Sequence, residues 1–349
     1  MPLTRSFNYW NRRQFLYFLS AVTGSVALHG CNQSTGSTPG AGDRLAASVG
    51  IVTWIGYTPI YIAKAKGFYE ELGLDLDLKV FNSGAEAIAA FTAGQIDGLS
   101  LVPSEAVTVA ANGTDYRVVY VVDTSNGGDG ILARNSIKDV AAFADKQIAV
   151  EQGGVSHFYL LEVMNEQGLQ ESDVTLVNLT PDAAAAAYQA GKVDIAVTYA
   201  PFLFTANEAQ KDGRILHDSS QLTTPTAIAD LIIFDTDFIA TNPEAVKVFI
   251  QANFKGLEFF QTHQQEGLAI AAENLGVTPG ELAEQIKGVR LADLADNISM
   301  LNDPTSNLYL LTPLNSMVSF LENQEQIDQS PDLSNILDPQ FVLAIQSQE

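Results

Sequence analysis

Apolar runs bounded by turn residues alternate with segments of helical periodicity from residue 48 onwards. The first four runs, which indicate buried strands, are 48–54, 76–81, 99–102 and 118–122. Helices are expected between them, because Pro59 suits a first helical position and Ser83 with Glu86 forms a capping box. Pro103 begins a third predicted helix. This alternation is the signature of βαβ units, so we predict an α/β fold with mostly parallel strands.

The same pattern repeats in a second cycle that begins at Ser136. Its predicted strands are 147–150, 174–179, 215–216 and 230–234, and its predicted helices are 156–167 and 183–190. The motif G-Q-I-D-G-L-S at 94–100 returns as G-K-V-D-I-A-V at 191–197, which suggests two similar lobes. After Pro243 the pattern is helical and is expected to pack on the first lobe. The predicted helices there are 243–262, 267–274, 279–287 and 312–323.

The length and charge of the chain limit its partners. A chain of 349 residues is long enough for two domains and a sizeable core. It holds 18 Lys and Arg against 41 Asp and Glu, a formal net charge of −23. That excess of acids argues against binding nucleic acid or an anionic bilayer through charge. We therefore expect no nucleic-acid partner, and no motif indicates a cofactor.

The first thirty residues have the features of a targeting segment rather than of a folded domain. Arg12 and Arg13 belong to a basic start, and the uncharged stretch 15–28 that follows is too short to span a bilayer as a helix. The run around the arginine pair resembles the twin-arginine export signal. L-H-G-C at 28–31 resembles a bacterial lipobox, although His29 replaces the usual small residue.

Cys31 is the only cysteine, so no disulfide within the chain and no cysteine metal site can form. The lipobox resemblance implies that Cys31 becomes lipidated and is the mature N-terminus. The alternative is cleavage nearby without a lipid. Residues 1–30 would then be a signal peptide and residues 31–46 a flexible tether. The protein is expected in the periplasm, exported by the twin-arginine route and held at a membrane by the lipid.

A polar, glycine-rich stretch at 123–133, D-T-S-N-G-G-D-G-I-L-A, lies between two apolar runs. Glycines permit close backbone approach, so its polar groups could reach a small molecule directly. The alternative is an ordinary solvated turn. Other loops are candidates too, because ligands of open α/β sheets bind at the carboxyl ends of strands. The ligand-binding candidates are Trp54, Tyr57, Ser104, Glu105, Asp123, Ser125, Asn126, Asp129, Glu151, Ser156, His157, Tyr199 and Asp230.

No constellation for catalysis or metal binding is evident, since the sequence lacks G-x-S-x-G, H-E-x-x-H and P-loop motifs. His157 is the one histidine in a candidate site, and a lone histidine at a helix start is more often a packing or hydrogen-bonding residue. Trp54 as a core residue and Tyr199 as part of a strand-end turn are also ordinary interpretations. We predict a binding protein with no catalytic residue, no metal and no cofactor.

Several motifs together resemble the solute-binding proteins of bacterial ABC importers for sulfonates, taurine, nitrate and thiamine-pyrimidine precursors. They include G-F-Y-E-E-L-G-L at 67–74, S-G-A-E-A at 83–87, A-V-E-Q-G-G-V-S-H-F at 149–158 and A-G-K-V-D-I-A-V-T-Y-A-P at 190–201. The resemblance implies a two-lobed periplasmic binding protein of type 2 with two crossing strands and a C-terminal helical region. The first lobe would be 47–130 plus 232–349, and the second 131–231. It also implies a monomer that delivers a solute to a permease and its ATPase.

The charge of the candidate loops bears on the ligand. They hold no lysine or arginine but five acids, which are Glu105, Asp123, Asp129, Glu151 and Asp230. A desolvated carboxylate is costly unless it is paired, and a cation would supply the partner. We therefore predict a small cationic nitrogen compound, such as a guanidinium or an amine, stacked on Trp54 or Tyr57.

Other ligands and classes stay open. An aliphatic sulfonate or taurine would be held by N–H groups at Ser156 and by Ser104, and the resemblance places Asp230 where members that bind amino-sulfonates present an acid. A pyrimidine precursor of thiamine is a third candidate. The fold also has a pyrimidine-forming enzyme that uses a cysteine-rich cluster, which the lack of cysteine after Cys31 disfavours. A membrane-tethered sensor is another class, and its gene neighbours would distinguish it.

Overall fold

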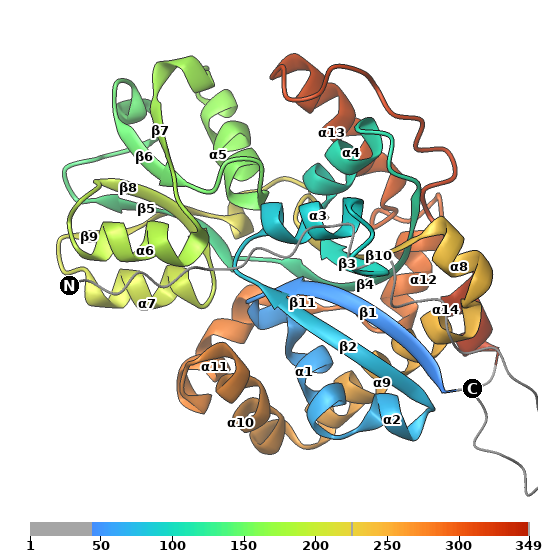
Figure 1. Cartoon of the computed structure of the whole chain (residues 1–349). Coiled ribbons are helices and arrows are strands. Elements are labelled where there is room, and N and C mark those ends of the chain that lie inside the picture. The colour runs from blue at the N-terminus through green and yellow to red at the C-terminus, as the bar shows by residue number, and fades with distance from the viewer. Residues whose placement is uncertain (1–43, 225, 348–349) are drawn as a thin grey trace, which may run out of the picture. The chain divides into compact units, whose positions relative to one another are not determined.

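Two β-sheets organise the part of the chain that the computed structural model describes, residues 44–224 and 226–347 (Figure 1). The predicted signal peptide, Cys31 and residues 31–43 of the predicted tether lie outside this range. We call the part built on the six-stranded sheet the first lobe, and the part built on the five-stranded sheet the second lobe. The residue boundaries of the lobes stay a prediction.

The first sheet has the strand order β11-β4-β10-β3-β1-β2. Its strands are β1 Leu45–Val52, β2 Leu74–Phe81, β3 Gly98–Leu101, β4 Tyr116–Ser125, β10 Ala229–Asp235 and β11 Val289–Leu291. β1 runs parallel to β2 and β3, as expected for βαβ units, whereas β10 runs antiparallel to β3 and β4. The sheet is therefore mixed, and the predicted mostly parallel sheet is wrong, because β10 returns from the second lobe.

The second sheet has the order β7-β6-β8-β5-β9. Its strands are β5 Asp129–Arg134, β6 Gln147–Val150, β7 Thr175–Asn178, β8 Ile195–Tyr199 and β9 Gly213–Asp218. β6 is parallel to β7 and β8, while β5, which arrives directly from the first lobe, is antiparallel to β8 and β9. Each sheet thus combines parallel strands with a strand that enters through a crossing.

The chain crosses between the lobes twice. Residues 126–128 lead from β4 into β5, and residues 219–228 lead from β9 into β10. In the pairing of β4 with β10, Asp123 lies directly opposite Asp230. The strands of the two crossings therefore bring two acids to the same point of the first sheet.

Helices cover the sheets in both lobes (Figure 1). They are α1 Thr58–Ala65, α2 Phe68–Glu71, α3 Gly84–Thr92 and α4 Pro103–Ala111 in the first lobe, and α5 Val155–Glu166, α6 Pro181–Gln189 and α7 Phe202–Ala209 in the second. After β10 come α8 Thr236–Thr241, α9 Pro243–Thr262, α10 Gln264–Leu275, α11 Pro279–Gln285, α12 Leu294–Asn302, α13 Leu311–Asn323 and α14 Gln340–Gln346. The predicted helix 243–262 is confirmed as α9.

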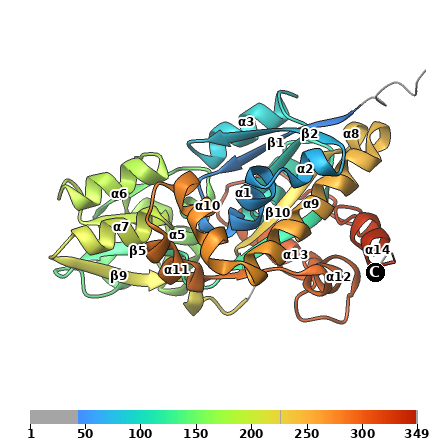
Figure 2. The same ribbon diagram turned by 90° about the horizontal axis from the view of Figure 1, so that it is seen from below.

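α9 packs its apolar face against the first lobe, beside α1 (Figure 2). Val246, Phe249 and Ile250 are buried on this face. Gly256 lets the two helices approach closely, because a Cβ there would lie 2.2 Å from the carbonyl oxygen of Pro59. Residues of the C-terminal helices share one hydrophobic core with the first sheet. The prediction that these helices pack on the first lobe is confirmed.

The elements that lack a counterpart in the sequence prediction include α7, α8, β11, α12 and α14. β11 pairs with β4 in a region where only helices are predicted, and its three residues are too few to show a strand pattern. α12 begins with a capping box formed by Asp293 and Asp296, a signal that the sequence does contain. Within the described residues, no helix is both long and apolar enough to cross a membrane.

Candidate ligand-binding site

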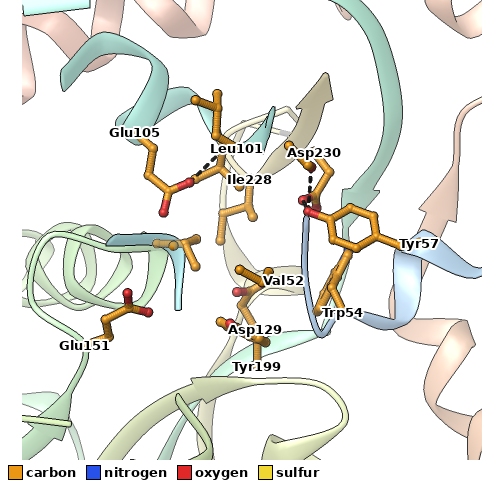
Figure 3. Close-up of a pocket in the computed structure, with 14 residues that line it drawn as sticks. Val52, Trp54, Tyr57, Leu101, Glu105, Asp129, Glu151, Tyr199, Ile228 and Asp230 are labelled. Atoms are coloured by element: carbon orange, nitrogen blue, oxygen red, sulfur yellow. Dashed lines mark hydrogen bonds between the residues drawn. The ribbon is translucent and has the colours of Figure 1, made fainter. Parts of the chain in front are cut away.

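A small pocket lies between the two lobes, with a cavity volume of about 30 Å³ (Figure 3). The carboxyl ends of β1 and β3 reach it from the first lobe, and the start of β5 and the end of β8 from the second. Four acids line it: Glu105, Asp129, Glu151 and Asp230. Its aromatic wall is Trp54, Tyr57 and Tyr199. No lysine or arginine lines it among the residues that the structure describes.

Trp54 lies two residues beyond the end of β1 and is held firmly in place. Its indole Nε1–H donates a 3.1 Å hydrogen bond to Asp123 Oδ2. Its ring meets Tyr199 edge-on, with 5.9 Å between the ring centroids. A Cβ on Gly128, in the first crossing, would lie 2.4 Å from the indole ring. The glycine of the crossing therefore makes room for the indole, which forms a fixed wall of the pocket.

The two acids of the crossing strands lie next to this wall. Tyr57 O–H donates a hydrogen bond to Asp230 Oδ1, and the Tyr57 and Ser100 hydroxyls are 2.6 Å apart. Burial raises the pKa of Asp123 well above its usual range, and the charge of Asp230 raises it further. Burial also raises the pKa of Asp230, against the hydrogen bonds that it accepts. Facing carboxyls in such a site hold a proton between them unless a cation is present.

Asp129 opens β5 and presents a carboxylate oxygen with no partner. The residue is 3% exposed and lies opposite Tyr199 in the pairing of β5 with β8. Burial raises the pKa of Asp129 to about 7, although a hydrogen bond from Ser125 opposes the rise. No hydrogen bond to its Oδ2 comes from the described residues. A buried carboxylate oxygen without a donor is a vacant acceptor.

Glu105 comes from the first lobe and Glu151 from the second, and both carboxylates approach Gly84. Glu105 Oε2 accepts a 3.1 Å hydrogen bond from the N–H of Val102, at the start of its own helix α4. Burial raises the pKa of Glu105 to about 8. Glu151 belongs to the second lobe, yet its Oε1 accepts a 3.0 Å hydrogen bond from the N–H of Ala85 in the first lobe. This bond joins the lobes across the pocket.

Six predicted binding residues do not line the pocket: Ser104, Asp123, Ser125, Asn126, Ser156 and His157. The side chain of Ser125 turns to Ser219, with 2.7 Å between the hydroxyl oxygens. His157 Nε2 lies 3.3 Å from a carboxylate oxygen of Glu171, and Asn126 is exposed. The two other serines are buried. Ser125 and His157 have partners nearby, whereas Ser156 Oγ has none among the described residues, so a place in a candidate loop does not by itself put a polar side chain in the pocket.

The sequence prediction omits Ser100 and the apolar wall of the pocket. Ser100 interrupts the apolar strand β3, a signal that sequence reasoning could have used. The apolar wall consists of Val52, Leu101, Val102, Val155 and Ile228. Apolar residues at strand ends look the same in sequence whether they fill a core or face a ligand, so no signal distinguishes them.

The two-lobed α/β architecture is that of the periplasmic binding proteins, which confirms the predicted fold class. The alkanesulfonate-binding protein SsuA from Xanthomonas axonopodis pv. citri, solved bound to MOPS, matches with a TM-score of 0.69 at 18% identity, covering 83% of this chain and 96% of that one. Residues 54–267 match the NMT1/THI5-like family model, and the chain belongs to this family. The taurine-binding periplasmic protein of Escherichia coli is 26% identical over 295 residues, which are 81% of this chain and 89% of that protein.

Enzymes also use this fold. The desulfurization enzyme DSZB matches with a TM-score of 0.63 at 18% identity, covering 87% of this chain and 99% of that one. The fold alone therefore does not separate binding proteins from enzymes. The function has to be argued from the residues of the pocket.

Proposed function

We propose that this protein captures a small solute in the periplasm for an ABC importer, and that the solute is a cation such as guanidinium or an amine. Family membership and the similarity to periplasmic binding proteins support the first part. In this proposal the lobes, residues 47–130 plus 232–349 and residues 131–231, close on the solute. A monomer held by a lipid on Cys31 then delivers the solute to a permease and its ATPase.

The main observation in favour of a cationic solute is the Asp129 carboxylate oxygen that has no hydrogen-bond partner among the described residues. This oxygen is buried in a pocket with three further acids and, among the described residues, no basic side chain. Burying an unpaired carboxylate costs several kcal/mol, by order of magnitude. A ligand that brings a positive charge and N–H donors removes that cost. An anion would add to it.

The size of the pocket favours a compact ligand. A dry cavity of about 150 Å³ admits benzene, whereas the cavity here is about 30 Å³. Guanidinium is small and flat, its N–H groups pair with carboxylates two at a time, and its face stacks on aromatic rings. Asp129 and Asp230 offer the carboxylates, and Trp54 offers the ring. A compact amine would use the same carboxylates with fewer donors.

An amino-sulfonate is the second candidate, favoured by the similarity to the taurine-binding periplasmic protein of Escherichia coli. Its ammonium group would pair with the acids of the pocket as a simple amine does. Its sulfonate would need basic side chains or free N–H donors. The N–H of Ala85 already donates to Glu151. The charge of the pocket therefore favours a ligand that is only cationic.

Binding without chemistry fits this pocket better than catalysis does. Among the described residues, no histidine or cysteine lines it, and its one serine, Ser100, is hydrogen-bonded to Tyr57. An activated nucleophile needs a base within hydrogen-bond reach. Ser100 and Tyr57 instead form a hydrogen-bond network with Asp230, which holds the Asp230 carboxylate in place.

Isothermal titration calorimetry at pH 8 tests the proposal with guanidinium chloride, methylammonium chloride, taurine, sodium methanesulfonate and sodium nitrate. We expect saturable binding of at least one of the two cations and none of methanesulfonate or nitrate. Asp129→Asn should weaken that binding, while Asp194→Asn, which removes the same charge from an exposed site, should not. Binding of the anions alone would overturn the cationic ligand.

A further inference from the structure

The Glu151 carboxylate reaches across the cleft to the start of a helix in the other lobe. It lies just after β6 and is 4% exposed. Its Oε1 accepts the Ala85 N–H over 3.0 Å. Burial raises the pKa of this carboxyl, and the hydrogen bond from the Ala85 N–H opposes the rise. A glutamate of the second lobe thus accepts a backbone N–H in the first turn of α3, where the Glu86 N–H already donates to Ser83 Oγ.

Such a position is the natural place for an anion. The first N–H groups of a helix lack partners within the helix and carry partial positive charge. A carboxylate, sulfonate or phosphate is therefore stabilised there. In this protein the place is filled by a side chain of its own, supplied from the opposite lobe. The bond exists only while the two lobes are together.

A glycine allows this arrangement. A Cβ on Gly154 would lie 2.8 Å from Glu151 Cδ and 2.9 Å from Glu151 Oε2. Gly154 has φ near −100°, a conformation open to any residue, so space and not backbone geometry makes this position sensitive. A methyl group at residue 154 would displace the Glu151 carboxylate without removing its charge.

A second feature of the pocket points to a ligand that does not compete for this place. Asp129 lines the same pocket, and its buried Oδ2 has no hydrogen-bond partner among the described residues. It needs a donor, whereas the start of α3 already has its acceptor. These two parts of the pocket therefore place opposite requirements on a solute.

We propose that Glu151 is a built-in anion that latches the cleft closed and keeps anionic solutes away from the start of α3. The latch stands without any assumption on the ligand, whereas the exclusion of anions rests on the proposed solute-binding function. An incoming sulfonate would have to displace Glu151 and then lie beside Glu105, which approaches Gly84 closely. Glu151 is thus a specificity-determining residue as well as a structural link.

The test uses Glu151→Ala, Gly154→Ala and the control Glu86→Ala in the full chain. Glu86 is exposed in the same first turn, so its loss removes an equal charge without freeing the donors. Hydrogen–deuterium exchange of a peptide containing residues 84–87 reports the latch without any ligand. We expect at least tenfold faster exchange at Ala85 in the Glu151 and Gly154 variants and no change in the control.

Calorimetry with sodium sulfate and sodium methanesulfonate reports the exclusion of anions. We expect the Glu151 and Gly154 variants to bind at least one of these anions at least tenfold more tightly than the wild type and the control. Unchanged exchange in both variants would refute the latch, and unchanged anion binding would refute the exclusion. A failure of guanidinium to bind the wild type would count against the proposed cationic ligand alone, because neither readout contains a cation.

Discussion

Asp129→Asn is the substitution that most sharply separates stability from binding in this pocket. Burial raises the pKa of Asp129 from 3.8 to about 7. At about 1.4 kcal/mol for each pH unit, this rise corresponds to about 4 kcal/mol. Because the folded state holds the proton more tightly than the unfolded state, this contribution to the free energy of unfolding is lost as the pH rises from about 4 to about 7.

The variant therefore gains stability where the wild type loses it. Asparagine stays neutral, so we expect Asp129→Asn to match the wild type near pH 4 and to exceed it by up to about 4 kcal/mol at pH 8. That difference is roughly 8 °C in Tm, at about 2 °C for each kcal/mol. Thermal melts of the ligand-free protein at pH 5 and pH 8 measure it. Asp194→Asn is the control, because this exposed aspartate loses the same charge.

Asp129→Asn should weaken the binding of guanidinium, although it stabilises the ligand-free protein. Removing one member of a buried, hydrogen-bonded charge pair costs about 3 kcal/mol, or roughly a hundredfold in Kd. We expect calorimetry with guanidinium chloride to show this loss in Asp129→Asn at pH 8. A variant that is less stable than the wild type at pH 8, or that binds guanidinium equally well, would refute the assignment of Asp129 as the vacant acceptor.

Three further predictions follow from the same geometry. Guanidinium affinity should rise up to about tenfold per pH unit between pH 5 and pH 7 as Asp129 loses its proton, and calorimetry should show a flatter profile for Asp129→Asn. Trp54→Leu should raise Kd roughly tenfold through the lost ring face, measured by calorimetry, with unchanged affinity arguing against stacking. Gly256→Ala should destabilise the protein by about 2 kcal/mol in thermal melts, because its Cβ would meet the Pro59 carbonyl. Gly280→Ala, at a helical site where the added Cβ meets no atom within 4 Å, should not destabilise the protein. Equal melting temperatures of the two variants would contradict the tight packing of α1 on α9.

Regular elements follow from local signals in this chain, which is why many of them are predictable. α9 matches its prediction because Pro243 suits a first helical position and a continuous apolar face follows it. β2 begins two residues before its predicted run, and β4 begins two residues before and ends three residues after its run. The added end of β4, Asp123 to Ser125, is polar and belongs to the strand because it pairs with β10 and β11. The direction of β10 was not predictable, since it depends on a return from the second lobe.

The residue types of the candidate site can be predicted from the sequence, but the hydrogen bonds between them cannot. The acids at strand ends and loops could be picked out as a group, and the structure brings Glu105, Asp129, Glu151 and Asp230 into one pocket. Sequence could not tell which acids are already engaged within the protein. Glu151 is bound to a backbone N–H 66 residues away, and Asp123 to an indole 69 residues away. The first contact depends on how the two lobes meet, and the second on how β1 and β4 are placed in the first sheet.

A crystal structure of the protein grown with guanidinium chloride tests the cationic pocket most directly. We expect a flat ion between the lobes, within hydrogen-bond distance of Asp129 Oδ2 and with its face near Trp54. We also expect that Glu151 still accepts the Ala85 N–H. An empty cleft in the presence of guanidinium, together with a sulfonate bound at the start of α3 in crystals grown with methanesulfonate, would contradict a cationic pocket.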